Sequence, residues 1–336
     1  MKEHTNKKIK AKINARHKDR RELYDHVAGF KPRCVSFRSN RPVLHLEKGK
    51  GESFQEAFVD PGCGRVHLCK KCGEHQSKLR SGIIISILKA LSTLFLDMMV
   101  AHYTFTLPKN HKWQTNECAR SYKDFFKAVR ETLEHCFPGC GCILVLHNWS
   151  SKNPENKHIH IHVIIIGLTK KGGLVSGFVD EKALKEVYKS KIGLNANDVI
   201  NVHQEYFKAS TDFGRIAHVV RYALRSPIED YCKEGEKPLS AKYIDRVKHL
   251  VGIQNTRYCG WLSNSTKAKT LESFGIVKAE DSEEEKWRLV ERTEVDRIDE
   301  NGNIVLKNGI CILKEDLKDK SFLIKKPFYK VIKPPG

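Results

Sequence analysis

The sequence has few acidic residues for its basic content. It holds 40 Asp and Glu against 60 Lys and Arg, which gives a formal net charge of +20. A surplus of this kind is expected of a protein that binds a polyanion, because phosphate contacts supply affinity that does not depend on sequence. A membrane-surface binder or an ordinary basic protein is the alternative. The charge therefore favours nucleic acid as a partner.

An apolar secretory signal is also lacking, because residues 1–30 are polar and basic. One apolar run, residues 82–103, has about the length of a membrane span. Lys89 and Asp97 interrupt it, so a buried helix that continues into a strand explains it better. We therefore expect an intracellular, cytoplasmic protein without a membrane anchor.

The chain has an odd number of cysteines, eleven, and no visible signal peptide, which argues against a disulfide framework. Cys69 and Cys72 form a CxxC knuckle, a common source of two of the four ligands of tetrahedral zinc. His67 and His75 are alternative ligands, and reduced, unliganded cysteines are the alternative interpretation. We predict a structural Zn²⁺ ion with four thiolate ligands, Cys34, Cys63, Cys69 and Cys72.

Composition divides the chain into four segments. Residues 1–33 are expected to form a solvated basic arm, and residues 34–80 a loop-rich zinc-binding module. Residues 81–265 have the pattern of an α+β core. Residues 266–336 form an accessory segment with a β-hairpin at the Asn301-Gly302 turn. Five residues of the arm are expected to contact DNA, Lys7, Lys8, Lys10, Lys12 and Arg16.

Hydrophobic periodicity predicts the elements of this core. Strands are expected over residues 99–107, from residue 143 onward, and over residues 158–166. Helices are expected over residues 117–135, 181–191 and 214–224.

Three histidines alternate with isoleucines in residues 158–162 (HIHIH). Residues i and i+2 of a strand face the same side, so His158, His160 and His162 are expected to project together. Neighbouring neutral imidazoles make a site for a divalent metal or for phosphate. A polar edge strand with chance histidines is the weaker alternative, because all three share one face.

Tyr222 lies in the last of the predicted helices. At helical spacing His218, Tyr222 and Arg225 share one face, and Arg221 lies beside Tyr222. A phenol has an ordinary pKa near 10 and is a poor nucleophile at neutral pH, but nearby cations favour the phenolate and hold a phosphodiester. Taken alone, Tyr222 is more simply interpreted as a core aromatic residue.

Together, the histidine strand and the tyrosine helix predict phosphodiester chemistry. A divalent metal, Mg²⁺ or Mn²⁺, would polarise a phosphate oxygen while Tyr222 attacks the phosphorus. The resulting phosphotyrosine bond conserves energy, so strands can be rejoined without ATP. The predicted catalytic residues are Tyr222, Arg221, Arg225 and His218, and the predicted metal ligands are His158, His160 and His162.

The order of several motifs resembles that of the HUH endonuclease superfamily, which is named for its His-hydrophobic-His strand. Besides that strand, the motifs are residues 104–108 (TFTLP), 146–149 (LHNW), 218–225 (HVVRYALR) and 257–261 (RYCGW). The likeness extends over residues 60–265 and is strongest to the rolling-circle transposases, which carry a zinc-ribbon-like cysteine cluster, and to related plasmid replication initiators. It implies an antiparallel sheet with helices and a central histidine strand.

The resemblance also implies a function. These enzymes nick and rejoin single-stranded DNA through a 5′-phosphotyrosine. We expect a rolling-circle replication initiator of a plasmid or virus, with a transposase as the alternative. The expected partners are single-stranded DNA at an origin or element end and host replication proteins, and the expected location is the nucleoid or a plasmid.

One position departs from the family pattern. Two-tyrosine members place their first tyrosine four residues before the second, where this chain has His218. The resemblance therefore implies a single-tyrosine enzyme. It also implies a third metal ligand, for which His158, His147 and Glu205 are the candidates.

Two further interpretations stay open. The histidine strand also fits the histidine-triad signature of nucleotide hydrolases and transferases, in which His160 would attack a phosphate. That interpretation leaves the charge, the cysteines and the tyrosine helix unexplained. The second is a catalytically decayed DNA-binding protein, which the presence of His160, His162 and Tyr222 argues against.

Overall fold

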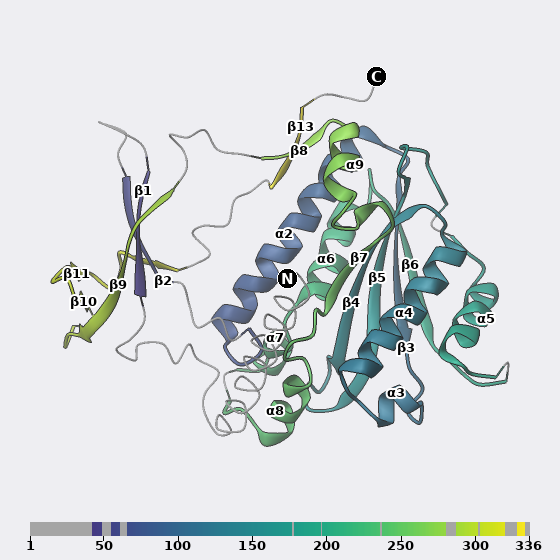
Figure 1. The fold of residues 1–336 in the computed structure, drawn as a ribbon, viewed down its shortest axis with the longest axis horizontal. Coiled ribbons are helices and arrows are strands. Elements are labelled where there is room, and N and C mark those ends of the chain that lie inside the picture. Colours follow the sequence, from purple (N-terminus) through teal and green to yellow (C-terminus); the bar gives the residue numbers. More distant parts are fainter. Residues whose placement is uncertain are drawn as a thin grey trace, which may run out of the picture.

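The fold is α+β and is built on an antiparallel sheet, as the sequence predicts (Figure 1). It is seen in a computed structural model that describes residues 42–48, 55–60, 66–176, 178–195, 197–235, 237–279, 287–301, 303–319 and 328–332.

The central sheet has the strand order β6-β3-β5-β4-β7, and every neighbouring pair is antiparallel. The strand that carries the histidines, β5, is therefore in the middle, which confirms its predicted position. The bounds are β3 Met99–Thr106, β4 Cys140–Trp149, β5 Lys157–Thr169, β6 Val202–Lys208 and β7 Thr256–Cys259.

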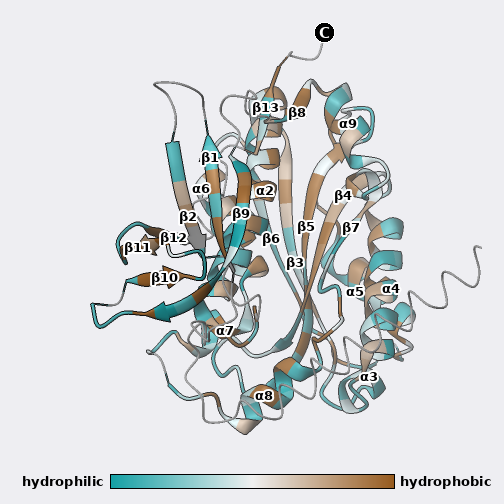
Figure 2. Ribbon diagram, turned by 60° about the vertical axis from the view of Figure 1, so that its left-hand side comes forward, coloured by the Kyte–Doolittle hydropathy of each residue, from teal (hydrophilic) through white to brown (hydrophobic). Residues whose placement is uncertain are grey.

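The core lies on both faces of this sheet, because β5 is buried on both sides. Ile159, Ile161 and Val163 pack in one apolar cluster, whereas Ile164 and Ile166 pack in the other. Figure 2 shows β5 as mostly hydrophobic along its length. A strand buried on both faces has a nearly continuous apolar sequence rather than strict alternation.

Two helices cover the first face, α4 (Ala119–Cys136) and α5 (Glu181–Ile192). Helix α4 turns its aromatic residues Tyr122, Phe125 and Phe126 toward the sheet, and all three are buried. Its exposed side has ion pairs at i,i+4 spacing, such as Arg130 with Glu134. This amphipathic pattern is the one from which the helix is predicted.

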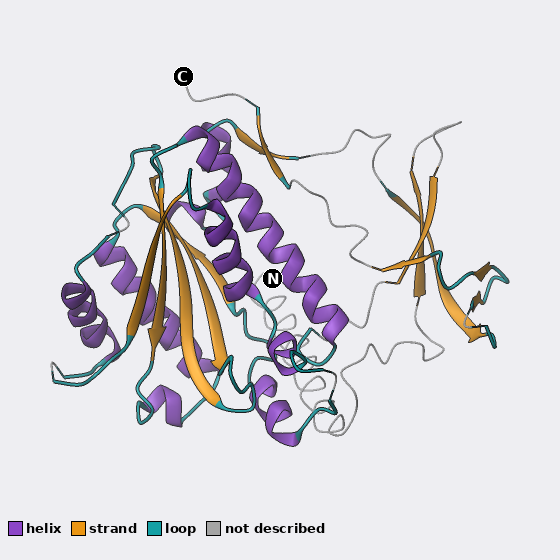
Figure 3. Ribbon diagram, turned by 180° about the vertical axis from the view of Figure 1, so that it is seen from behind, coloured by secondary structure: helices purple, strands orange, loops and turns teal. Residues whose placement is uncertain are grey.

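The second face is covered by α2 (Lys70–Leu94), α6 (Phe213–Leu224) and α9 (Lys267–Ser273). Figure 3 shows α2 and α6 beside each other over this face. The apolar run at residues 82–103 is divided between the end of α2 and strand β3, which confirms the predicted helix followed by a strand. Among the described residues, no helix combines the length and apolar character needed to cross a membrane.

Short elements close the end of the sheet at which β4 finishes and β5 begins. Residues of α7 and α8 form a small apolar cluster there with Leu68. The remaining helices and the 3-10 turn are α3 Lys112–Thr115, α7 Pro227–Tyr231, α8 Ala241–Lys248 and Gly260–Leu262.

A second sheet joins segments from the two ends of the described chain. Its order is β11-β10-β9-β1-β2-β12, and a separate pair is formed by β8 and β13. The bounds are β1 Pro42–Lys48, β2 Gln55–Asp60, β8 Ile276–Lys278, β9 Arg288–Ile298, β10 Ile304–Leu306, β11 Cys311–Ile312, β12 Leu317–Asp319 and β13 Tyr329–Val331. The hairpin predicted at Asn301-Gly302 is confirmed by the antiparallel pairing of β9 with β10.

This sheet differs from the expected division of the chain. Strands β1 and β2 belong to the expected zinc-binding module at 34–80, yet they pair with β9 and β12 of the expected accessory segment at 266–336. The boundary expected at residue 80 falls inside α2. The physical reason is that the local pattern of a strand does not indicate which distant segment it pairs with.

Candidate functional site

Three buried histidines meet on the face of the central sheet that α6 covers. His160 and His162 lie on β5, and His147 lies on β4 directly opposite His160. One ring nitrogen of each is within 4.8 Å of the others, and all three side chains are buried. Three imidazole nitrogens this close together could hold one metal ion after small side-chain movements.

In each of these rings, one nitrogen is held by a neighbouring group. Nε2 of His147 is 2.7 Å from the carbonyl oxygen of Ala223, and Nδ1 of His160 is 2.9 Å from that of His158. The opposite nitrogens, Nδ1 of His147 and Nε2 of His162, are buried without a hydrogen-bond partner. Buried polar atoms are normally paired, so these two mark a place for a ligand.

Burial keeps the three imidazoles neutral. It is the main cause that lowers the pKa of each ring, and the neighbouring histidines and Arg225 add to the effect. The pKa of His160 falls to about 3. Neutral imidazole is the form that binds metal, so the site needs no deprotonation near neutral pH.

A fourth histidine supports the cluster from β3. Nε2 of His102 is 3.1 Å from Nδ1 of His162, and Thr104 Oγ1 lies 3.2 Å from the same nitrogen. On its other side, Nδ1 of His102 is 3.5 Å from a carboxylate oxygen of Glu205 on β6. Glu205, His102 and His162 therefore lie in a row across three neighbouring strands, β6, β3 and β5.

Tyr222 lies on the other side of the cluster, on α6. Its ring meets the His162 ring edge-on at a centroid separation of 5.3 Å. The guanidinium of Arg225 stacks on the Tyr222 ring, 3.6 Å from its centre. The Tyr222 hydroxyl is 3.0 Å from Oγ of Ser151, which follows β4. The tyrosine is half-buried, so its hydroxyl is both positioned and accessible.

A chain of hydrogen bonds orients this hydroxyl. Arg225 donates to Asp230 at 2.7 Å and to Ser151 Oγ at 2.7 Å. Since Ser151 accepts from a cation, its own proton is available for Tyr222. Burial raises the pKa of Tyr222, but the hydrogen bonds from Ser151 and Arg225 and the Arg225 charge outweigh it, so the pKa lies below its ordinary value. Trp149 fixes the same carboxylate, donating to Asp230 at 2.9 Å.

Two of the three predicted metal ligands lie in the cluster, and the third does not. His160 and His162 belong to the cluster, whereas His158 is exposed and lies outside it. Residues i and i+4 of a strand are about 13 Å apart, so His158 and His162 are too far apart to share one ion. His147 takes the third place because an opposite residue on the neighbouring strand is closer. Glu205 contacts His102 rather than the cluster.

The predicted catalytic residues are also separated. Tyr222 and Arg225 meet, but α6 ends at Leu224, and Arg225 is extended rather than on the helix face. The end at Leu224 is the predicted one, and Pro227 accounts for it, since a proline disfavours helical conformation just before it. Arg221 and His218 are both exposed, and no contact joins either of them to the cluster within the described residues.

The predicted zinc ligands are described only in part. Cys69 precedes the first residue of α2 and Cys72 lies in its first turn, and both side chains are buried. Cys34 and Cys63 lie outside the described residues, as do all five arm residues predicted to contact DNA, Lys7, Lys8, Lys10, Lys12 and Arg16. The zinc site and the arm stay predictions.

Four residues at this site were missed by sequence reasoning: His102, Ser151, Asp230 and the indole of Trp149 as a donor. A signal existed for His102 alone, which occupies a buried position of a predicted strand and has an ionisable side chain. Ser151 lies in a connecting segment and Asp230 in the short helix α7, and their contacts depend on the tertiary packing of α6 and α7 against β4.

Comparison with known proteins adds no relative: no family model, no curated protein and no solved structure matches this chain.

Proposed function

We propose that this protein nicks and rejoins single-stranded DNA through a covalent 5′-phosphotyrosine on Tyr222, with a divalent metal held by His147, His160 and His162. The observation that carries the proposal is the contact between Tyr222 and the buried histidine cluster. A tyrosine that an arginine holds beside imidazoles with unpartnered nitrogens is suited to attack on a phosphodiester.

The cluster fits a metal ion because of its unpartnered nitrogens. With the metal on Nε2 of His162, the proton of that ring is on Nδ1 and is donated to His102 Nε2. The proton of His102 is then on Nδ1, facing Glu205. Such chains are the usual support of metal-bound histidines.

The donor set also ranks the metals. Three imidazoles suit transition metals better than Mg²⁺, which prefers oxygen ligands and binds nitrogen weakly. Of the two ions predicted from the sequence, Mn²⁺ is therefore the one we propose. When bound, it would polarise a non-bridging phosphate oxygen and hold the scissile phosphate against the tyrosine.

The protein's own groups account for the nucleophile. Arg225 stacks on the Tyr222 ring and polarises Ser151, whose hydroxyl donates to the phenolate oxygen as it forms. Asp230 holds Arg225 in place through a short charge-assisted hydrogen bond. These contacts favour the charged form of Tyr222 and fix the direction of its attack.

The bond changes balance without an external energy source. The Tyr222 oxygen forms a bond to phosphorus, and the bond from phosphorus to the 3′ oxygen breaks. The phenolic proton leaves to solvent, and the released 3′ oxygen takes up a proton. The reverse attack by the 3′ hydroxyl restores the strand and frees the tyrosine.

A replication initiator is the role that we propose for this chemistry. His218 stands one helical turn before Tyr222 and is exposed, so this surface of α6 supplies one tyrosine rather than two. A single tyrosine suits cleavage that leaves a 3′ end for extension at an origin, with host replication proteins as partners. A structural zinc held by Cys69, Cys72 and the two upstream cysteines belongs to the same proposal.

The test is a search for the covalent adduct. Purified protein is incubated with Mn²⁺ and a library of labelled single-stranded oligonucleotides of random sequence, and adducts are separated under denaturing conditions. We expect an adduct whose modified peptide contains Tyr222. Tyr222→Phe should abolish it, while the controls His218→Ala and Tyr258→Phe should retain it.

Other outcomes separate the alternatives. An adduct that survives Tyr222→Phe rules out the proposed nucleophile. A nucleotide attached to His160 after incubation with nucleoside phosphates would identify a histidine-triad transferase instead. Binding of the oligonucleotides without an adduct, at any metal tested, would identify a decayed enzyme.

A further inference from the structure

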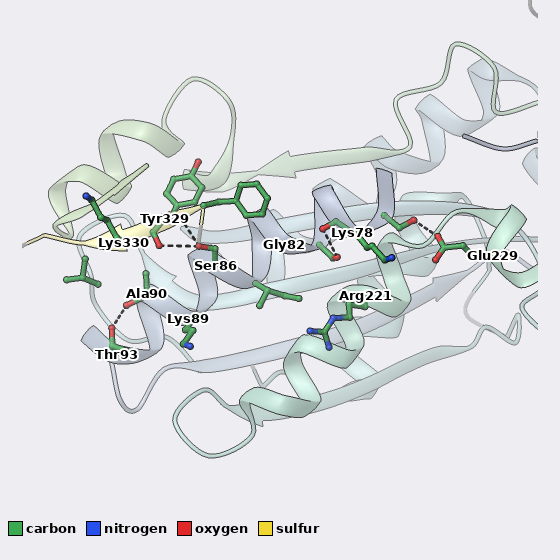
Figure 4. A pocket seen from close by; sticks show the side chains of 15 residues that line it. Lys78, Gly82, Ser86, Lys89, Ala90, Thr93, Arg221, Glu229, Tyr329 and Lys330 are labelled. Atoms are coloured by element: carbon green, nitrogen blue, oxygen red, sulfur yellow. Dashed lines mark hydrogen bonds between the residues drawn. The ribbon is translucent and has the colours of Figure 1, made fainter. Parts of the chain in front are cut away.

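A cavity of about 830 Å³ lies between α2, the C-terminal strand β13 and the start of α7. Figure 4 shows it, with α2 forming its floor and Arg221 of α6 at one side. Along α2 the lining extends from Ser77 to Thr93, which corresponds to a rise of about 24 Å. The cavity is therefore an elongated groove, hereafter the α2 groove.

Basic side chains line the α2 groove. Lys78, Lys89, Arg221 and Lys330 are all exposed, and within the described part of the chain none of them forms an ion pair. The acidic residue of the lining is Glu229, whose carboxylate is already engaged: it accepts from the Ser226 backbone at 2.7 Å and from the Ser77 hydroxyl. The groove thus presents uncompensated positive charge.

The wall between these cations is apolar and aromatic. Phe328 and Tyr329 line the groove together with Ile85. Phe328 lies so close to α2 that a Cβ at Gly82 would be 2.6 Å from its ring, and Ser86 holds the Tyr329 backbone at 2.7 Å. Cations flanking aromatic rings are the usual chemistry for binding unpaired nucleic acid, since the rings stack on bases while the cations bind phosphates.

One end of the α2 groove adjoins the site. Arg221 lines the groove and precedes Tyr222 on α6, and Glu229 lines it and precedes Asp230, the partner of Arg225. Successive residues of a helix differ by about 100° in direction, so Tyr222 faces the histidine cluster while Arg221 faces the groove. A strand that lies in the groove would reach the tyrosine at this end.

We propose that the α2 groove binds the single strand that flanks the scissile phosphate, with Lys78, Lys89, Arg221 and Lys330 on its phosphates. The proposal rests on the proposed function and names the residues that would hold the substrate. The protein's own basic arm, residues 1–33, is the less suitable occupant because it has the same sign of charge as the groove.

The first test measures how affinity depends on salt. A fluorescein-labelled single-stranded oligonucleotide of mixed sequence is titrated by anisotropy at several salt concentrations. The double variant Lys78→Gln/Lys89→Gln should bind about tenfold more weakly and reduce the slope of log affinity against log salt by about 1.4. The matched control Lys123→Gln/Lys182→Gln removes the same charge from exposed positions on α4 and α5. An equal loss in both variants would overturn the proposal.

The second test needs no variant and reports on folded wild-type protein. Lysine acetylation is quantified by mass spectrometry with and without the same oligonucleotide. Lys78, Lys89 and Lys330 should be protected, and Lys123 and Lys182 should not. Equal protection at both sets, or no change at the groove lysines because another segment already covers them, would contradict the proposal.

These measurements separate the two proposals. Adduct formation on Tyr222 with groove variants that bind normally would leave the nickase standing and remove the α2 groove. Binding that depends on the groove without any adduct would leave the groove standing and remove the catalytic assignment.

Discussion

His147 and Asn148 are neighbours on β4, both fully buried, and they face opposite sides of the central sheet. The amide nitrogen of Asn148 donates to Glu117, Tyr122 and the backbone of Arg246, at 2.8–3.0 Å. His147, in contrast, has one held nitrogen and one without a partner. The side-chain oxygen of Asn148 is also buried without a partner, so the two residues differ in how many protein groups hold them: three for the Asn148 amide and one for the His147 ring.

The surroundings extend this difference. Next to Asn148, the buried carboxylate of Glu117 forms an ion pair with Arg246, so charge is balanced and α4, β4 and α8 are tied together. Next to His147, the cluster holds imidazoles without a carboxylate, and two nitrogens have no partner. A buried cluster whose charges are balanced stabilises the fold, whereas a histidine cluster with two unpartnered nitrogens is suited to a ligand.

The largest effect is expected at the histidine cluster, on adduct formation. His147→Gln should lower the rate of adduct formation about a thousandfold, because a metal ligand is lost. Mn²⁺ binding, measured by calorimetry, should fall in parallel, while the melting temperature should change little. His158→Ala is the control, since His158 lies on β5 with His160 and His162 but outside the cluster. A large loss of stability in His147→Gln would show that the histidine is structural.

Substitutions next to Asn148 should instead change the stability of the fold. Glu117→Ala should reduce the free energy of unfolding by about 3–5 kcal/mol, because the buried Arg246 loses its buried partner and keeps only the exposed Asp245. Urea unfolding measures this change. Glu134→Ala, which removes an exposed carboxylate from α4, should cost less than about 1 kcal/mol. Comparable costs for both substitutions would contradict the assigned difference.

A smaller effect is expected where the histidine cluster meets its supporting carboxylate. Glu205→Gln should weaken Mn²⁺ binding about tenfold to a hundredfold, because His102 loses the group that fixes its tautomer. His203→Gln serves as the comparison, since His203 is exposed and only contacts the other oxygen of Glu205, at 3.6 Å. Equal Mn²⁺ binding by the two variants would show that Glu205 does not support the cluster through His102.

The smallest expected effect is on the acid sensitivity of folding. Burial raises the pKa of Glu117, but hydrogen bonds from Tyr122 and Arg246 outweigh it, so the folded pKa lies below the ordinary 4.5. This carboxylate therefore contributes stability above pH 4.5 that is lost as the pH falls through the lower, folded value. Glu117→Gln should lack this component, so its urea midpoint should decline less over the same acid range. A parallel decline would disprove it.

Much of the fold could be predicted from the sequence because its signals are local. Alternation at residues 158–162 and helical spacing at residues 117–135 and 214–224 predict β5, α4 and α6. The partner of β1 could not be predicted, because β9 is far away in the sequence and no local pattern indicates which strand it pairs with.

The site was predictable to the extent that single elements define it. Tyr222, His160 and His162 are each visible within one strand or helix. The choice of His147 over His158 required the register of β4 against β5, and the contact of Arg225 with Ser151 required the packing of α6 against β4. Cross-strand register and the packing of helices on a sheet are tertiary features, which local patterns do not encode.

The pairing of β1 with β9 has a consequence for synthesis of the chain. About 240 residues separate the two strands, and a ribosome adds roughly 5–20 residues per second, so β1 and β2 emerge about 10–50 s before their partner. An isolated two-stranded unit is marginal in water, so this hairpin remains an exposed edge until then. Completion of the second sheet therefore marks a nascent chain whose central sheet has already been synthesised.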